Sequence, residues 1–306
     1  MISLSRPDFP EVIDSTLVSQ IRSCGQKANL ESLLHWKPRN QSVHLHAGAA
    51  FATGLEKGRI AFYLDGKSQE ESTAIALQAL MLAYGDFECP ADSAKSLERM
   101  CGALEFYFAN YPMENDHAVP VTLPSGKRGI EFSFAEPIDI KHPVTGNPII
   151  YVGRMDMLVD YAGAVYGEDD KTTSSLGASW SKQWDLRSQF TAYTWGAQRA
   201  GFPVAGFLVR GISILKTKYD HQQALTYRPQ WMIDRWYEQM LKDVQGFIDQ
   251  WERGAFNFNL DHACNEYGGC VFRTICLSRP EEAQNWLETG FVKRRWDPVT
   301  RTETLL

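Results

Sequence analysis

The sequence predicts an α/β fold in which a central mixed β-sheet is flanked by helices. Helical patterns fill the first third of the chain, strand patterns fill the middle, and a long amphipathic helix follows. Hydrophobic residues make up 44% of the 306 residues, which is enough for a sizeable core. We expect no membrane association, because no apolar run reaches the ~20 residues that a membrane span needs. A net charge of −6 excludes a protein coated in basic charge but leaves room for a local basic groove.

Helices are expected where apolar residues recur at intervals of three and four residues. In the first of them, Leu17, Val18 and Ile21 follow this spacing after Asp14, a residue type that caps helices. The expected helices span residues 14–36, 47–64, 69–84, 91–110, 183–200 and 229–252. Two of these helices make up a helical insertion at roughly 65–115.

Strands are expected where apolar and polar residues alternate, or where a short apolar run lies between turn residues. The alternation begins at residues 131–134, after the helical pattern has ended near Pro112. The other expected strands span residues 149–161, 164–172, 204–209 and 211–216. Strands in the middle of the chain, with helices before and after them, predict one central sheet.

The two strands on either side of Ala162-Gly163 allow a geometric prediction. A turn centred between these residues pairs positions whose numbers sum to 325 (162 plus 163), which places Asp156 opposite Asp169. Because side chains alternate between the faces of a strand, Asp169 and Lys171 share a face with Asp156. The Cβ atoms of directly opposed residues lie ~4.5–5.5 Å apart. Two carboxylates at this separation repel each other unless a cation lies between them.

These residue types suit the hydrolysis of phosphate esters. A hard cation such as Mg²⁺ prefers oxygen ligands, which Asp156 and Asp169 supply. The ammonium of Lys171 can orient a nucleophile or stabilise negative charge that develops on a phosphate. The alternative is a solvated polar strand end at residues 168–170, because short matches to an acid-x-lysine pattern are common by chance.

Together with their neighbours, these residues resemble a known family. The core motifs of the PD-(D/E)XK nuclease superfamily are similar to three segments of the chain, Gly153-Arg154-x-Asp156, Asp169-Asp170-Lys171-Thr172 and Gln189-x-x-x-Tyr193. The resemblance covers roughly residues 120 to 215. It is closest to the RecB-like and AddB-like exonucleases, which include many phage-encoded proteins.

The resemblance implies a restriction-endonuclease-like core within a single nuclease domain over residues 1–306. The expected parts are N-terminal helices with the first cluster cysteine, a helical insertion, the catalytic core, and a C-terminal helix with a cysteine-rich tail. In chain order these parts cover residues 1–64, 65–115, 116–228 and 229–306.

The resemblance also implies roles for the residues of the hairpin. Asp156 and Asp169 would bind Mg²⁺ or Mn²⁺, and the main-chain carbonyl of Asp170 would complete the set of ligands. Lys171 would serve catalysis. These roles agree with the chemistry that the residue types allow.

Further family positions are matched less closely. Gln189 and Tyr193, one helical turn apart, would position the DNA strand or order the site. An acid on the first core strand often joins the metal ligands in the family, and Glu131 is either that acid or one more exposed strand residue. The family carries Gly-x-x-x-His-x-x-x-Glu on an early helix, where this chain has Ala52 in place of the histidine. His46 either substitutes for that ligand or is a plain surface residue.

Six cysteines in 306 residues are too few for a disulfide scaffold, and their placement is more informative. Cys264, Cys270 and Cys276 follow one another at intervals of six residues, which predicts a metal or cluster site. Zn²⁺ and iron–sulfur clusters both take four ligands, and on chemistry alone any of the other three cysteines could be the fourth. The alternative is a set of unrelated reduced cysteines.

The resemblance favours Cys24 as the fourth ligand. In the RecB-like branch that carries a cluster, one cysteine lies in an N-terminal helix and three follow the core. This implies a [4Fe–4S] cluster bound by Cys24, Cys264, Cys270 and Cys276, with Zn²⁺ as the alternative. The spacing here differs from that of AddB-type proteins, which have two residues and then five between the last three cysteines. Cys89 and Cys101 are then buried or incidental thiols.

The expected function is that of a Mg²⁺- or Mn²⁺-dependent DNA exonuclease acting on a single strand or a duplex end. It would be cytoplasmic, in a bacterial or phage-infected cell, and could work with a helicase or recombination partner. Two other classes stay open. The first is a nucleic-acid-binding or assembly protein of the same fold with weak or no cleavage, which Ala52 suggests. The second is a redox-sensing cluster protein.

Overall fold

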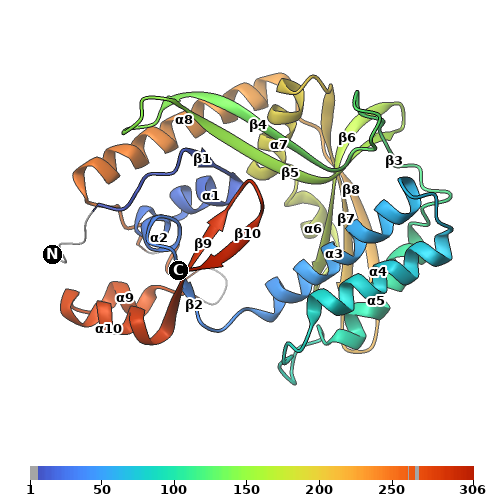
Figure 1. Cartoon of the computed structure of the whole chain (residues 1–306), viewed down its shortest axis with the longest axis horizontal. Helices are drawn as coiled ribbons and strands as arrows, with labels where there is room; N and C mark the ends of the chain where they lie inside the picture. The colour runs from blue at the N-terminus through green and yellow to red at the C-terminus, as the bar shows by residue number, and fades with distance from the viewer. Residues whose placement is uncertain (1–5, 261, 266–268) are drawn as a thin grey trace. The chain divides into compact units, whose positions relative to one another are not determined.

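The computed structural model describes residues 6–260, 262–265 and 269–306, and the chain divides into two compact units. Figure 1 labels their elements. We call the first the core unit, which consists of Gln41–Phe134 and Arg154–Ile233. We call the second the terminal unit, which consists of Met1–Asn40, Ala135–Gly153 and Asp234–Leu306.

The core unit is organised around the central strands of a mixed β-sheet. These strands follow the order β5-β6-β7-β8 and span Pro148–Tyr161, Ala164–Thr173, Val204–Ile214 and Tyr219–Leu225. The β5–β6 and β7–β8 pairs are antiparallel, whereas β6 and β7 are parallel. Strands β3 (Val119–Pro120) and β4 (Ile130–Lys141) also pair with β5. The predicted mixed α/β fold with a central sheet is therefore confirmed.

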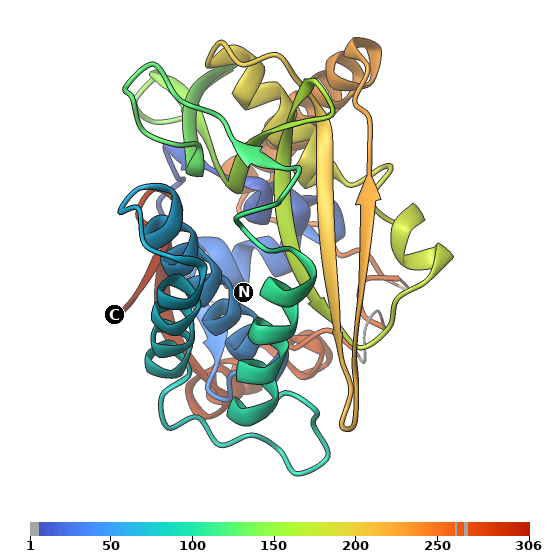
Figure 2. The same ribbon diagram turned by 90° about the vertical axis from the view of Figure 1, so that its right-hand side faces the viewer.

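Helices pack against this sheet. Helices α3, α4 and α5 lie side by side along one side of β6, β7 and β8, as Figure 2 shows. They span Val43–Tyr63, Gln69–Tyr84 and Leu97–Asn110. Helix α4 begins where the sequence predicts, because Ser68 and Glu71 form a capping box there. Helices α6 (Ala178–Lys182) and α7 (Ser188–Arg199) follow β6.

The two faces of β7 pack against different helices. Ile212 and Ile214 belong to the apolar core of α3, α4 and α5. Phe207, which points to the other face, stacks on Phe190 of α7 with ring centroids 4.5 Å apart. Because side chains alternate, odd-numbered residues of this strand face α7 and even-numbered ones face α3 and α5. In β6, odd-numbered residues from 167 to 173 pair with odd-numbered residues of β7, and even-numbered with even-numbered. The same division between the two faces therefore applies to these residues of β6.

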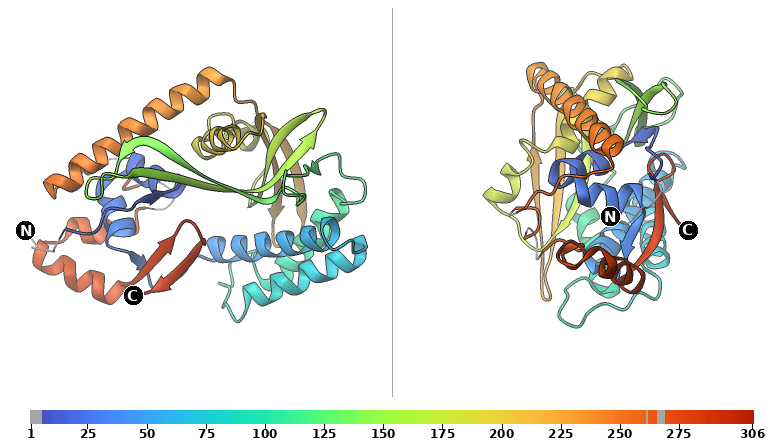
Figure 3. Two further views of the ribbon diagram at one scale, coloured as in Figure 1. Left: turned by 45° about the horizontal axis from the view of Figure 1, so that its top comes forward. Right: turned by 90° about the vertical axis from the view of Figure 1, so that its left-hand side faces the viewer.

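The terminal unit is built from both ends of the chain and from Ala135–Gly153, which includes most of β4 and the first part of β5. Its first elements are β1 (Val12–Ile13), α1 (Ser15–Ser23), α2 (Gly25–Ala28), the π-helical turn η1 (Asn29–Leu33) and β2 (Trp36–Pro38). Its last elements are α8 (Gln230–Arg253), α9 (Arg273–Leu277), α10 (Pro280–Gly290), β9 (Phe291–Asp297) and β10 (Thr302–Leu305). The hairpin of β9 and β10 pairs with β2, as Figure 3 shows. No helix among the described residues has both the length and the apolar character to cross a membrane.

The structure differs from the predicted elements in several places. The helix predicted at 91–110 begins at Leu97, where Ser96 caps it, and the helix predicted at 47–64 begins earlier, at Val43. The helix predicted at 14–36 is broken, because Cys24 has an extended main chain (φ −168°) between α1 and α2. The two strands predicted at 204–209 and 211–216 form the single strand β7, in which Arg210 is buried instead of turning the chain. The helix predicted at 183–200 starts at Ser188, after the shorter α6 has ended.

Candidate active site

The hairpin of β5 and β6 has the register that the sequence predicts. Ala162 and Gly163 both have positive φ, at 53° and 81°, as the favoured two-residue hairpin turn requires. The ladder runs from this turn to Met157 opposite Glu168, and the paired numbers sum to 325 throughout. The next position on each strand is an aspartate.

Asp156, Asp169 and Lys171 lie on the face of this hairpin that α7 covers. Alternation along both strands from the last ladder pair places the three side chains there. The ammonium of Lys171 forms an ion pair with Oδ1 of Asp169. The side chain of Asp169 is only 5% exposed, while that of Lys171 is 31% exposed and so can reach a ligand. The main-chain N–H of Asp170 donates a hydrogen bond to Oδ2 of Asp156 at 2.9 Å.

The charged groups of this site shift the pKa values of Asp156 and Lys171. Burial, and then the charge of Asp169, raises the pKa of Asp156 well above its ordinary value. Asp170 and Glu131 act in the same direction. Burial by itself lowers the pKa of Lys171, but the carboxylates of Asp169 and Asp156 outweigh it and raise that pKa. The lysine is therefore a charged ammonium at neutral pH, beside carboxylates that a further cation would stabilise.

Glu131 lies close enough to the site for its charge to act on Asp156. It is half-buried at the start of β4 and has a positive φ of 53°. Its Oε2 lies 2.8 Å from Nε of Arg154, with which it forms an ion pair. The structure thus places the acid of the first core strand at the edge of the site, with an arginine partner.

Helix α7 carries Gln189 and Tyr193 over the same face. Nε2 of Gln189 donates a hydrogen bond to the hydroxyl of Tyr193 at 3.1 Å. Tyr193 is 7% exposed and is among the groups that raise the pKa of Lys171.

The donor atoms of the site suit a hard divalent cation. Oδ1 of Asp169 is buried without a well-directed hydrogen bond, although Lys171 lies beside it. Asp156 contributes carboxylate oxygens on the same face, and such oxygens are the ligands that Mg²⁺ and Mn²⁺ prefer. In residues 6–260, 262–265 and 269–306, no three His, Cys, Asp or Glu side chains are grouped tightly enough to hold an ion. The fit therefore rests on the chemistry of the two aspartates.

Sequence reasoning missed a buried lysine next to the site. Lys95 precedes α5, is 4% exposed, and donates a hydrogen bond from Nζ to Oγ1 of Thr172 at 2.8 Å. Thr172 directly follows Lys171 in β6. Burial lowers the pKa of Lys95 to about 8. Its position in the loop between α4 and α5 carries no sequence signal for burial.

Helix α3 contains the segment that is compared with the family's histidine motif. Ala52 is exposed on this helix. Glu56, which corresponds to the glutamate of the motif, forms a surface ion pair with Lys57 at 2.7 Å. The ring of His46 makes a hydrogen bond of 2.8 Å with the main-chain oxygen of Tyr84. Glu56 is thus paired with Lys57, and His46 is hydrogen-bonded to the main chain of Tyr84.

The four cysteines predicted as cluster ligands all belong to the terminal unit, and the other two to the core unit. Partial burial raises the pKa of the Cys276 thiol to about 11. The charges of Cys270, Cys24 and Cys264, in that order, add to this effect. Among the described residues, however, the four cysteines are not grouped tightly enough to hold an ion. The N–H of Cys270 donates a hydrogen bond to the carbonyl of Cys264 at 3.1 Å.

Known proteins resemble this chain to different extents. Among solved structures, the chain is similar to an exonuclease candidate from Eubacterium rectale, with 13% identity and a TM-score of 0.48 over 88% of this chain and 94% of that one. It is also similar to the protein SSO0001, with 12% identity and a TM-score of 0.28 over 74% of this chain and 84% of that one. The comparison with curated proteins gave no match. A model of the PD-(D/E)XK nuclease superfamily matches residues 16–277, and the chain therefore belongs to that superfamily.

Proposed function

We propose that this protein is a Mg²⁺- or Mn²⁺-dependent DNA exonuclease of the RecB-like type, with a structural iron–sulfur cluster. The observation that carries the nuclease activity is the placement of Asp156, Asp169 and Lys171 on one face of a hairpin with the predicted register. Two buried carboxylates on one face would gain from a cation, and the pKa of Asp156 is already raised by burial and by the charge of Asp169.

Each residue of the site has a role that its position supports. Asp156 and Asp169 would hold the ion, with the main-chain carbonyl of Asp170 as a further ligand. A divalent ion held there would supply a Lewis acid that polarises a phosphate and lowers the pKa of a bound water. The ammonium of Lys171 would hold a non-bridging phosphate oxygen and stabilise its developing charge. Tyr193, hydrogen-bonded to Gln189, would keep that ammonium in place.

An iron–sulfur cluster is supported by the cysteines of the terminal unit. Cys24 comes from the N-terminal helices and the other three come from the segment after α8, so one cofactor would tie the two ends of the chain together. The charges of Cys270, Cys24 and Cys264 help to raise the pKa of the Cys276 thiol, which is consistent with ligands of one cofactor. Ligand groups of this kind close around the metal when it binds, since metal binding is coupled to folding.

DNA degradation tests the proposed activity. Wild-type protein should shorten end-labelled linear DNA in Mg²⁺ or Mn²⁺, stop in EDTA, and leave covalently closed circular DNA intact if it acts only from ends. Lys171→Ala should lower the rate by roughly 100-fold or more, the usual cost of removing a group that stabilises transition-state charge. Lys127→Ala, at an exposed lysine of the same unit, should match the wild type. Equal rates for wild type and Lys171→Ala would contradict the proposal.

A second function has one observation in its favour. Helix α3 has an exposed alanine, Ala52, at the position of the family's histidine, which removes a metal ligand that the family provides. A nucleic-acid-binding or assembly protein with weak cleavage would tolerate that loss. Retention of labelled DNA by wild-type protein, without degradation in either metal, would establish this function in place of the nuclease.

A further inference from the structure

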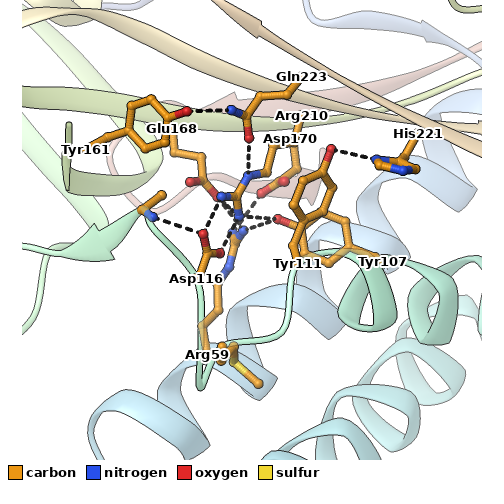
Figure 4. A network of polar contacts seen from close by, with 12 residues as sticks. Arg59, Tyr107, Tyr111, Asp116, Tyr161, Glu168, Asp170, Arg210, His221 and Gln223 are labelled. Atoms are coloured by element: carbon orange, nitrogen blue, oxygen red, sulfur yellow. Dashed lines mark hydrogen bonds and ion pairs between the residues drawn. The ribbon is translucent and has the colours of Figure 1, made fainter.

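Behind the proposed site, on the face of β6 that packs against α3 and α5, lies a buried group of charges that we call the arginine cluster (Figure 4). Its members come from α3, the loop after α5, β6 and β7: Arg59, Asp116, Glu168, Asp170 and Arg210. Their side chains are 4%, 8%, 0%, 3% and 2% exposed. Three carboxylates therefore share two guanidinium groups away from water.

Both arginines of the cluster contact Glu168 and the hydroxyl of Tyr107, but they differ in their other carboxylate partner. Nη1 and Nη2 of Arg210 donate to the two carboxylate oxygens of Asp116, each at 2.6 Å. Arg210 lies farther from Glu168, at 3.5 Å. Arg59 instead uses Nη2 for Glu168 and Nη1 for Asp170, both at 2.7 Å. Arg210 thus pairs mainly with Asp116 in the loop after α5, while Arg59 pairs with the two carboxylates of β6.

The partners of Arg59 are the residues on either side of Asp169. Because side chains alternate, Glu168 and Asp170 point toward α3 while Asp169 points toward α7. Asp170 also connects the two faces, since its carboxylate meets Arg59 while its N–H holds Oδ2 of Asp156. A shift of Asp170 relative to Arg59 therefore moves the amide that orients Asp156.

Stability alone does not account for Arg59. Buried ion pairs lose much of their attraction to desolvation, and apolar replacements of similar volume are often neutral or stabilising. Helix α3 also has close apolar contacts of its own. A Cβ atom on Gly58 would lie 2.9 Å from Cβ of Ala76 in α4, so these two helices already touch closely. The contact of α3 with α4 at this point is therefore made without the guanidinium.

We infer that Arg59 is a positioning residue for the metal ligands, acting through β6 from the opposite face of the sheet. By pairing with Glu168 and Asp170 together, its planar fork fixes the main chain of β6, so that Asp169 and the Asp170 amide keep Asp156 in its ligand orientation. This inference rests on the proposed function, because it concerns the same metal site. Substitution of groups that orient metal ligands typically lowers metal affinity by roughly 10- to 100-fold.

The test compares Arg59→Lys with the matched variant Arg210→Lys. Both keep a charge in the same buried cluster, but a lysine at position 59 cannot bridge Glu168 and Asp170 as the fork does. Mn²⁺ binding without DNA is measured by electron paramagnetic resonance of the free ion, and unfolding is followed in urea. We expect the Mn²⁺ dissociation constant of Arg59→Lys to rise roughly tenfold or more. The Mn²⁺ dissociation constant of Arg210→Lys should change less than about threefold. The two variants should lose comparable amounts of unfolding free energy.

The outcomes separate this inference from the proposed function. If the wild type binds Mn²⁺ and degrades DNA while Arg59→Lys binds the ion equally well, the positioning role is refuted and the nuclease stands. Equal losses of affinity in the two variants would likewise refute it, because they would reflect general disruption of the cluster. A wild type that neither binds the ion nor cuts DNA overturns both. Should Arg59→Lys fail to fold, the charge-balanced double variant Arg59→Gln with Glu168→Gln replaces it under the same criteria.

Discussion

The buried lysine next to the site gives a quantitative prediction for stability. Lys95 is 4% exposed, and burial lowers its pKa from the ordinary value of 10.5 to about 8. Each pKa unit is worth about 1.4 kcal/mol, so the folded state loses about 3 kcal/mol by holding this ammonium at neutral pH. Lys95→Met removes that cost but gives up the hydrogen bond to Thr172, worth about 1 kcal/mol. The variant should therefore be more stable than the wild type by about 2 kcal/mol.

The dependence on pH follows from the same values. Because the pKa of Lys95 is lower in the folded state, the unfolded chain binds more protons between about pH 8 and 10.5. Stability of the wild type therefore rises with pH across that window. The cost is fully present below about pH 8 and is lost as the pH approaches 10.5. The advantage of Lys95→Met should disappear over the same interval.

Native-state hydrogen exchange is the suitable assay, because it measures the stability of a region amide by amide. Amides of α5 and β6 report on the region around Lys95. Lys127→Met, at an exposed lysine of the same unit, is the matched control and should leave protection unchanged. A Lys95→Met variant that is less protected than the wild type at neutral pH would refute the reasoning. So would an advantage that persists unchanged above about pH 10.5.

Two other predictions concern packing and the cysteines. A Cβ atom at Gly206 would overlap the main-chain oxygen of Thr226, so Gly206→Ala should lower Tm markedly. A Cβ atom at Gly246 would meet nothing within 4 Å, so Gly246→Ala should stabilise helix α8 by roughly 0.5–1 kcal/mol. Equal Tm values for the two variants would contradict this prediction. After anaerobic purification, the Cys276→Ser variant should lack iron, acid-labile sulfide and the absorbance near ~400 nm, whereas the control variant Cys89→Ser should keep all three. The same iron content in both variants would exclude Cys276 as a ligand.

The hairpin was predictable because its determinants are local. A small residue followed by glycine specifies a two-residue turn, and the turn fixes the register of everything that follows along the two strands. The structure has that turn at Ala162 and Gly163 and that register as far as Met157 and Glu168. Helix α4 was predictable for a similar reason, since its capping box lies within four residues.

Other parts of the fold depend on contacts that the chain order does not reveal. The pattern of β7 suggests two strands because a charge interrupts its apolar run, yet Arg210 lies within the sheet, where Asp116 neutralises it. The break at Cys24 has no strong local breaker before Gly25, and its extended main chain is accompanied by contacts from Cys24 and Gln26 to Asn257, far along the sequence. Such long-range pairings have no periodic signature.

The same reasoning explains why the residues of the proposed site could be predicted, whereas the residues that contact β6 from its other face could not. The aspartates and the lysine follow from alternation along one hairpin, whereas Arg59 and Lys95 reach β6 from a helix and a loop about a hundred and about eighty residues away in the chain. A charged residue on the buried stripe of α3 is the one signal that could have pointed to Arg59.

Strand β6 also decides between the two interpretations of its acidic sequence. A solvated strand end would expose Glu168, Asp169 and Asp170, but their side chains are 0%, 5% and 3% exposed. Burying consecutive carboxylates is costly unless each face of the strand supplies a cation. Arg59 supplies one on the face of α3, and Lys171 supplies one on the face of α7. Arg59 is buried and so can only neutralise its partners, whereas the partly exposed Lys171 can also meet a phosphate. Chemistry is therefore to be expected on the face of α7.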